Sequence, residues 1–207
     1  MVKIKIDKRK DILAHFAIQL KSIGFKKVGH SLIHESEKGL IQVLDFTLGQ
    51  NTSITRNHLG LGFGIFTDEW FAHLNFGKKP KSFRESHCEL RSEFNEFVPK
   101  DNNFCWIDLD LNINSIIEKS GLLIESFFLP QLNQLTTRNR IIEQWNQKGN
   151  AIGLPPRGRL SIAIIYWYLN QKSLAKNLID IELINNKGNP YFKFVIDKYE
   201  ELKKNAP

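Results

Sequence analysis

An adjacent histidine and cysteine, His87 and Cys88, are the most reactive pair of residues in the sequence. A thiolate beside an imidazole can act as a nucleophile with its base. Adjacent side chains rarely face each other, so a second histidine would have to come from elsewhere in the fold. Asp108 and Asp110 alternate at the end of a predicted strand and could share a face that attracts magnesium. Because no nucleophile elbow, phosphate-binding loop or zinc-protease motif is present, a hydrolase is an alternative without a catalytic signature.

Six histidines raise the question of a metal site. His30 and His34 are four residues apart, which suits one ion on a helix, but their segment has the pattern of a strand. Four residues of strand span about 13 Å, whereas two ligands of one zinc ion each lie about 2 Å from it. The two cysteines, Cys88 and Cys105, form no C-x-x-C pair. We therefore expect reduced thiols, no metal and no cofactor.

A basic loop near residue 80 is the feature that best suits nucleic-acid binding. Its lysines could neutralise phosphates while an interleaved aromatic residue, Phe76 or Phe83, stacks on a base. Phe83 could equally anchor the loop to the core. The candidate binding residues in this segment are Lys78, Lys79, Lys81, Arg84 and His87.

The net charge of +7 is distributed in segments along the chain. Residues 1–30 carry eight basic and two acidic side chains, residues 78–91 five and two, and residues 126–172 six and one. Acidic segments separate them. A nucleic-acid binder could have this pattern if the fold gathers the basic segments on one face, whereas a scattered basic surface simply keeps a domain soluble.

The composition predicts a folded, soluble chain. It is 42% hydrophobic with 15 phenylalanines, which excludes a disordered protein, and two cysteines cannot staple 207 residues as a disulfide scaffold. The first residues lack the apolar run of a signal peptide. The longest apolar stretch, residues 162–169, is too short to span a membrane. We therefore expect a cytoplasmic protein with no membrane contact.

Hydrophobic periodicity predicts an N-terminal helix over residues 8–23 that ends at Gly24. Runs of apolar and β-branched residues separated by turns then predict an antiparallel meander. The expected strands cover residues 26–35, 40–48, 54–66 and 104–109. The predicted fold class is α+β, with the N-terminal helix packed on an antiparallel sheet of about four strands and a helical C-terminal half.

Within the third strand, the run LGLGFGIF at residues 59–66 alternates large apolar residues with glycines. On a strand this places every side chain on one face and leaves bare backbone on the other. Three glycines weaken a strand through chain entropy, so something must approach the bare face. Either another element packs there, or the face forms a groove for an extended partner.

From residue 111 to the end of the chain, the spacing of apolar residues is helical. The predicted helices run from about residue 113 to Pro130, from Thr136 or Thr137 to Gly149, and over residues 159–171, 173–185 and 191–204. We expect an α+β domain over residues 1–150. Residues 151–207 form a helical C-terminal extension that is either separate or part of the same core.

Five stretches of the chain together resemble the bacterial family named domain of unknown function 4304. They are KSIGFKK, the strands LIQVLDF and HLGLGFGIF, CELRSEFNEFVPKDNNFCWIDL, and FFLPQLNQLTTRNRIIEQW. The resemblance covers residues 10–148. It implies the fold and a bacterial cytosolic setting, but it implies no activity, because the family has no established one. Its common positions Cys88, Arg91 and Trp106 carry no known catalytic role, and we add Arg91 and Trp106 to the candidate binding residues.

These observations predict a non-enzymatic cytoplasmic protein that binds another protein, of the immunity-like kind that neutralises or accompanies a bacterial toxin. One alternative is a nucleic-acid-associated protein that uses the basic loop. A second is a hydrolase of unknown substrate. The sequence does not indicate an oligomeric state.

Overall fold

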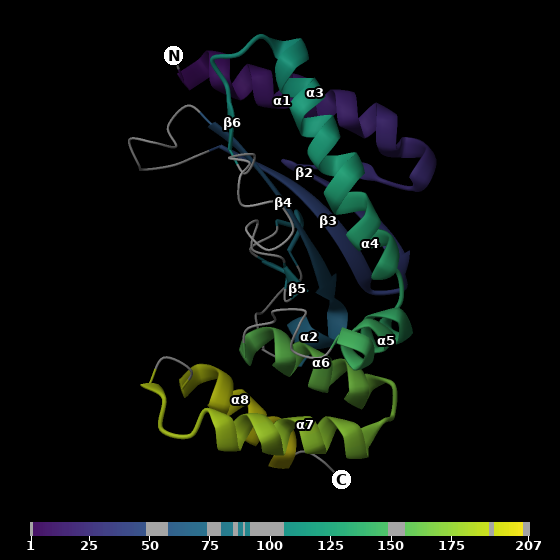
Figure 1. Cartoon of the computed structure of the whole chain (residues 1–207), viewed down its shortest axis with the longest axis vertical. Coiled ribbons are helices and arrows are strands. Elements are labelled where there is room, and N and C mark those ends of the chain that lie inside the picture. The colour runs from purple at the N-terminus through teal and green to yellow at the C-terminus, as the bar shows by residue number, and fades with distance from the viewer. Residues whose placement is uncertain are drawn as a thin grey trace.

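The computed structural model has an N-terminal helix, an antiparallel sheet and a helical C-terminal half, which confirms the predicted α+β class (Figure 1). Helices line one side of the sheet, and further helices form a layer at the end remote from the N-terminus. The structure describes residues 2–48, 58–73, 80–84, 87–88, 90–91, 106–148, 156–190 and 193–204.

The first helix, α1 (Val2–Gln19), continues into a 3-10 turn, η1 (Leu20–Ile23). Gly24 ends it in the left-handed conformation, with φ of 92°, as predicted. The helix begins earlier than the predicted residue 8 because neither proline nor glycine interrupts the preceding residues. Its buried residues face the sheet; they are Ile12, Leu13, Phe16 and Leu20.

The segment predicted as one strand over residues 26–35 is a hairpin. Strand β1 (Lys26–Val28) pairs with β2 (Ser31–Glu37), and the chain reverses at Gly29, whose φ is 62°. A left-handed residue at a two-residue turn is typical of tight hairpins. Strand β3 (Leu40–Leu48) follows as predicted.

Strand β4 (His58–Thr67) pairs with β3 on one side and with two short strands on the other. These are β5 (Leu90–Arg91) and β6 (Trp106–Asp108), and every pairing is antiparallel. The described sheet therefore has six strands in place of about four. The differences are the hairpin and β5, which is too short to leave a sequence pattern.

Alternation along β3 and β4 sends side chains to two different layers. One face carries the main core, formed with α1 and the helices that follow β6; the strand residues in it include Leu40, Leu44, Phe46, Leu59, Leu61 and Phe63. The other face carries a smaller cluster; its members are Ile33, Ile41, Val43, Phe66, Phe83 and Cys88. The glycines of β4 lie on this second face, opposite Val43, Asp45 and Thr47.

After the sheet, α3 (Ile113–Leu123) begins at Asn112, whose side chain accepts a hydrogen bond from the Ser115 backbone N–H. A π-helical segment, η4 (Ile124–Phe128), and α4 (Leu129–Gln134) continue it past Pro130. The predicted stop at this proline is wrong. Proline is tolerated in the first turn of a helix, where its missing N–H is not needed.

Helix α5 (Arg138–Lys148) begins beside Thr137, whose hydroxyl accepts from the Arg140 backbone N–H, as the predicted start requires. The remaining helices are α2 (Asp68–His73), α6 (Pro156–Tyr168), α7 (Lys172–Asn185) and α8 (Lys193–Lys204). Side chains of α6 contribute to the main core and to a separate cluster around Trp70 with α7 and α8. The division at residue 150 stays a prediction.

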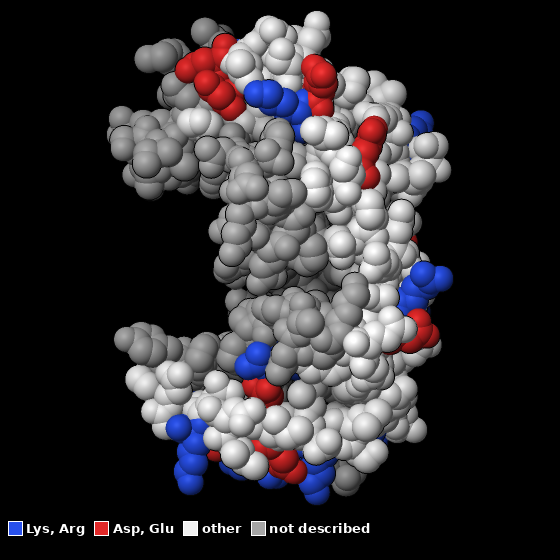
Figure 2. All heavy atoms as spheres, viewed as in Figure 1, with Lys and Arg blue, Asp and Glu red and all other residues white. Residues whose placement is uncertain are grey.

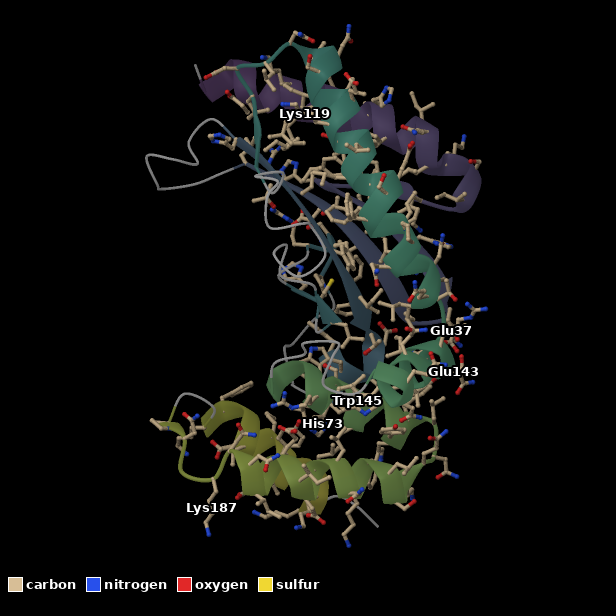
Figure 3. The ribbon with its side chains drawn as sticks, in the orientation of Figure 1. Glu37, His73, Lys119, Glu143, Trp145 and Lys187 are labelled. Atoms are coloured by element: carbon tan, nitrogen blue, oxygen red, sulfur yellow. The ribbon has the colours of Figure 1, made fainter. Side chains whose placement is uncertain are left out.

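Arg138 joins the sheet to the helical half. Its guanidinium, 2% exposed, bonds both carboxylate oxygens of Glu69 at 2.6 and 2.7 Å and pairs with Glu37 at 3.0 Å. It also lies 4.6 Å from the ring centroid of Tyr168 in α6. Burial by itself would lower the pKa of Arg138, but the bonds to Glu69 and Glu37 raise it. Figure 3 shows Glu37 near α5, at the end of the sheet closest to the helical layer.

We expect Arg138→Ala to destabilise the protein by about 3 kcal/mol, because it leaves the Glu69 carboxylate buried without its partner. Glu37→Gln should cost about 1 kcal/mol or less, because Glu37 is partly exposed and a glutamine oxygen can still accept the hydrogen bond from the Arg138 backbone N–H. Chemical denaturation of the two variants measures both values. Equal losses would contradict the role given to the Glu69 pair.

His73, at the end of α2, makes stability depend on pH (Figure 3). Burial lowers its pKa below the ordinary value of 6.5, against the opposing charge of Glu201 in α8. The folded protein therefore binds this proton less readily than the unfolded chain, so the stability it confers is present above pH 6.5 and is lost as the pH falls below it.

Replacing His73 by glutamine should remove part of the stability loss that the wild-type protein shows between about pH 7.5 and 5. Denaturation midpoints measured across this range test the expectation. His15→Gln, an exposed histidine in α1, is the matched control and should keep the wild-type pH profile. A His73 variant with an unchanged profile would show that this imidazole does not contribute.

Candidate functional site

A buried carboxylate organises the second face of the sheet. Asp45 of β3 accepts a hydrogen bond from the Ser31 hydroxyl at 2.9 Å. Arg84 donates from Nε to both carboxylate oxygens at 2.9 Å and from Nη2 to the Thr47 hydroxyl at 3.1 Å. These contacts attach the segment that contains Arg84 to β3.

Further cations surround this pair. Arg9 of α1 has Nη2 at 3.5 Å from Nε2 of His30, in the turn between β1 and β2. Burial, Arg9 and Arg84 hold the pKa of His30 below its usual value, and Lys27 acts in the same direction. Among the described residues, the Asp45 carboxylate acts in the opposite direction on the pKa of His30. We name Arg9, Lys27, His30 and Arg84 the basic cluster.

The loop residues next to Arg84 lie against the first hairpin. A Cβ built on Gly29 would be 3.3 Å from the Cβ of Ser82, so the two segments are in close contact. Phe83 is buried and meets the ring of Phe66 edge-on, with centroids 4.9 Å apart. Phe83 therefore anchors the loop to the core, which was one of the two predicted roles beside stacking on a base. Lys81 is exposed nearby.

The other predicted binding residues are only partly described. Lys78 and Lys79 lie outside the described residues. Arg91 is in β5 and Trp106 in β6, but their side chains are outside the described part of the structure. His87 is exposed, and its Nδ1 accepts from the Arg84 backbone N–H at 3.2 Å.

His87 and Cys88 have different surroundings. The Cys88 thiol is buried and donates to the Arg84 carbonyl at 3.5 Å, whereas the His87 imidazole is exposed. Asp108 accepts from the Asp110 backbone N–H at 2.8 Å, a bond that closes the turn after β6. Within the described ranges, no three histidine, cysteine or acidic residues gather as metal ligands would.

The bare glycine face is covered at Gly64. A Cβ there would lie 2.5 Å from the Cβ of Cys88 and 2.8 Å from its sulfur. Gly60 and Gly62 are buried as well. Close approach of another segment, the first of the two predicted explanations, therefore accounts for Gly64.

Only two of the three basic segments supply the cluster. Arg138, from the third, is buried against Glu69, and Arg159 pairs with buried Glu182 at 2.7 Å. On the face shown in Figure 2, basic and acidic side chains are interspersed. The sequence indicated an excess of charge in residues 1–30, but it did not indicate Arg9 or His30, because the hairpin turn that presents His30 was missed.

The sequence profile of the domain of unknown function DUF4304 matches residues 16–134. The chain belongs to the DUF4304 family. The matched DUF4304 region runs from α1 through the sheet to the end of α4, and it includes Lys27, His30 and Arg84 of the basic cluster. No curated protein and no solved structure matches the chain. Among the described helices, none has the length and apolar character that a membrane crossing requires.

In this DUF4304 protein, Gly64→Ala should destabilise the fold by about 2 kcal/mol, because the new methyl group overlaps Cys88. Gly121→Ala is the matched control. A methyl group there would meet the Phe16 ring at an ordinary 3.8 Å, and replacing a helical glycine should be neutral or stabilising by up to about 1 kcal/mol.

Thermal and chemical denaturation measure both changes, and Cys88→Gly should recover part of the Gly64→Ala loss. Wild-type stability in Gly64→Ala would contradict the close approach of Cys88.

Proposed function

We propose that this protein is a non-enzymatic protein-binding module whose partner docks on the outer face of α7. The observation that carries the proposal is a group of large apolar side chains left in solvent. Leu174, Ile181 and Ile184 are 46%, 44% and 73% exposed. Together we name them the α7 stripe.

The α7 stripe occupies one side of the helix. Residues seven and three positions apart lie on neighbouring lines of a helix surface, and the ten steps along the helix from Leu174 to Ile184 rise about 15 Å. Isolated exposed apolar residues are common, but a contiguous group marks an interaction surface.

The stripe is not an unused part of the core, because the opposite side of α7 is already packed. Ala175, Ile179 and Glu182 are buried there. Glu182 also pairs with Arg159 of α6, and Asn186 donates to its Oε2 at 3.0 Å. The inner face is therefore complete with α6 and α8, and the outer face is available for a partner.

Charge indicates the chemistry of that partner. Lys176 within α7 and Lys187 just after the helix are exposed and have no ion pair among the described residues. Figure 3 shows Lys187 pointing away from the ribbon. A second copy of a chain with net charge +7 would place these lysines against like charge. The surface suits a different protein that presents apolar residues with an acidic rim.

The arrangement of the reactive residues supports binding over catalysis, since His87 and Cys88 have different surroundings and Asp108 closes a turn. An immunity-like role in the bacterial cytoplasm, in which the partner is a toxin, is the more specific form of this proposal. A neutralising protein needs an exposed docking surface and no chemistry of its own.

Ile184→Asp should abolish capture of the partner, because it places a charge at the most exposed residue of the stripe without disturbing the core. The measurement is co-purification from the native host with wild-type and variant chains, followed by titration of the recovered protein against both purified chains. We expect loss of affinity by about a hundredfold.

Ile18→Asp, at an isoleucine of α1 that is 79% exposed, is the matched control and should bind as wild type. A partner retained equally by Ile184→Asp would overturn the proposal. So would a wild-type dimer, seen by light scattering, that Ile184→Asp converts to a monomer, because the stripe would then bind a second copy.

A further inference from the structure

The exposed residues of α7 have the spacing of a coiled-coil seam. Successive members are separated by three, four and three positions, and every one of them is exposed; they are Leu174, Asn177, Ile181 and Ile184. This is the spacing of the a and d positions of a heptad, which lie in one narrow line along a helix. We name these four residues the α7 seam, which consists of the α7 stripe and Asn177.

The α7 seam is straight and firmly supported from behind. A residue seven positions along a helix turns by only about 20° relative to the first, so Leu174 lies almost in line with Ile181. On the opposite side of the helix, Ala175 and Ile179 are buried. Figure 1 shows α7 at the outside of the helical layer, with α6 between it and the sheet. A fixed line of side chains at this spacing can pack into the groove of another helix.

Backbone hydrogen bonding favours a helix over a strand as the segment that covers the α7 seam. The backbone groups of α7 bond to one another within the helix, so its outer face offers no edge to which a strand could be added. An extended segment buried there would leave its own N–H and C=O groups without partners. A helix satisfies its backbone groups internally and can bury an apolar face without that cost.

The charges beside the α7 seam indicate the flank of the partner segment. Asp180 lies three positions after Asn177 and four before Ile184, next to the seam on the helix surface. Its carboxylate pairs with Lys203 of α8 at 2.6 Å. Lys176, four positions before Asp180, is exposed and has no ion pair among the described residues. The described flank therefore has an unpaired positive charge, which an acidic side chain would complement.

We propose that the partner segment that docks on the α7 seam is an amphipathic helix. It has apolar residues at heptad spacing, one polar residue opposite Asn177, and acidic residues on the flank next to Lys176. This inference rests on the proposed function, because it takes the α7 stripe as the docking surface and names the element that covers it.

Asn177 sets the register of the proposed helix. A polar residue in an otherwise apolar seam favours the alignment in which it meets another polar residue. A second copy of α7 fits this requirement poorly. In an antiparallel pair that aligns Leu174 with Ile184 of the other copy, Asn177 would face Ile181. The seam therefore suits a different helix whose polar position matches its own.

The test uses a synthetic peptide of about three heptads, with leucine at the a and d positions except for one central asparagine. Glutamate at the flanking e and g positions keeps the peptide from pairing with itself, because like charges repel. Fluorescence anisotropy of the labelled peptide measures its binding to the full-length protein. We expect saturable binding. A peptide of the same composition whose leucines are rearranged so that they share no face should not bind.

Variants of the protein and of the peptide locate the contact. Ile184→Asp and Leu174→Asp should each weaken peptide binding about tenfold or more, because a charge replaces an apolar residue of the seam. Ile18→Asp in α1 is the matched control and should bind as wild type. Wild-type protein should prefer the asparagine peptide over an all-leucine peptide by about fivefold, and Asn177→Leu should reverse this preference. A peptide with lysine in place of glutamate should bind about tenfold more weakly.

Binding that does not saturate, equal binding of the rearranged peptide, or wild-type affinity in both aspartate variants would overturn the helix as the occupant. The protein recovered from the native host separates this failure from failure of the proposed function. If Ile184→Asp loses that protein while the peptide does not bind, the α7 stripe docks another kind of segment and only the present inference fails. If Ile184→Asp retains that protein, the proposed function fails and this inference fails with it.

Discussion

The antiparallel pairing of β3 with β4 is the constraint on which the rest of the structure depends. Nine residue pairs connect the two strands, from Leu40 opposite Thr67 to Leu48 opposite Leu59. Because side chains alternate along a strand, this register decides which of them meet the helices and which meet the loop. A shift of β3 by one residue would place Asp45 in the main core, and a shift of β4 would place its leucines under the loop.

The same register explains the surroundings of the polar groups on the second face. Asp45 lies opposite Gly62, and Val43 lies opposite Gly64. Strand β4 therefore has no side chains next to Asp45 on this face. At Gly64 the space is taken by Cys88. The loop can then approach closely enough for Arg84 to reach the carboxylate, since a buried charge needs such a partner. The glycines weaken β4 but permit the contact that attaches the loop.

Regular elements were predictable from the sequence where the spacing of apolar residues repeats over many positions. This holds for β3, the glycine-rich strand and helices α5 to α8, whose boundaries differ from the predictions by a few residues. Short-range features were missed. The turn at Gly29 lies within a run that has strand composition throughout, and β5 has only two residues. At the site, Arg84 was predicted, whereas Arg9 and His30 were not, because their meeting depends on that turn and on the placement of α1.

Most of the basic cluster lies within the region that matches the DUF4304 family, and the α7 stripe lies outside it. Lys27, His30 and Arg84 lie in the region that matches DUF4304, on strands and a loop that the sheet positions. Leu174, Ile181 and Ile184 lie beyond it, on a helix fixed by α6 and α8. Arg138 joins the two parts through Glu37 and Glu69. The basic cluster on the shared sheet and the apolar stripe on the following helices are therefore held by different contacts, because Arg84 binds Asp45 in the first and Arg159 binds Glu182 behind the second.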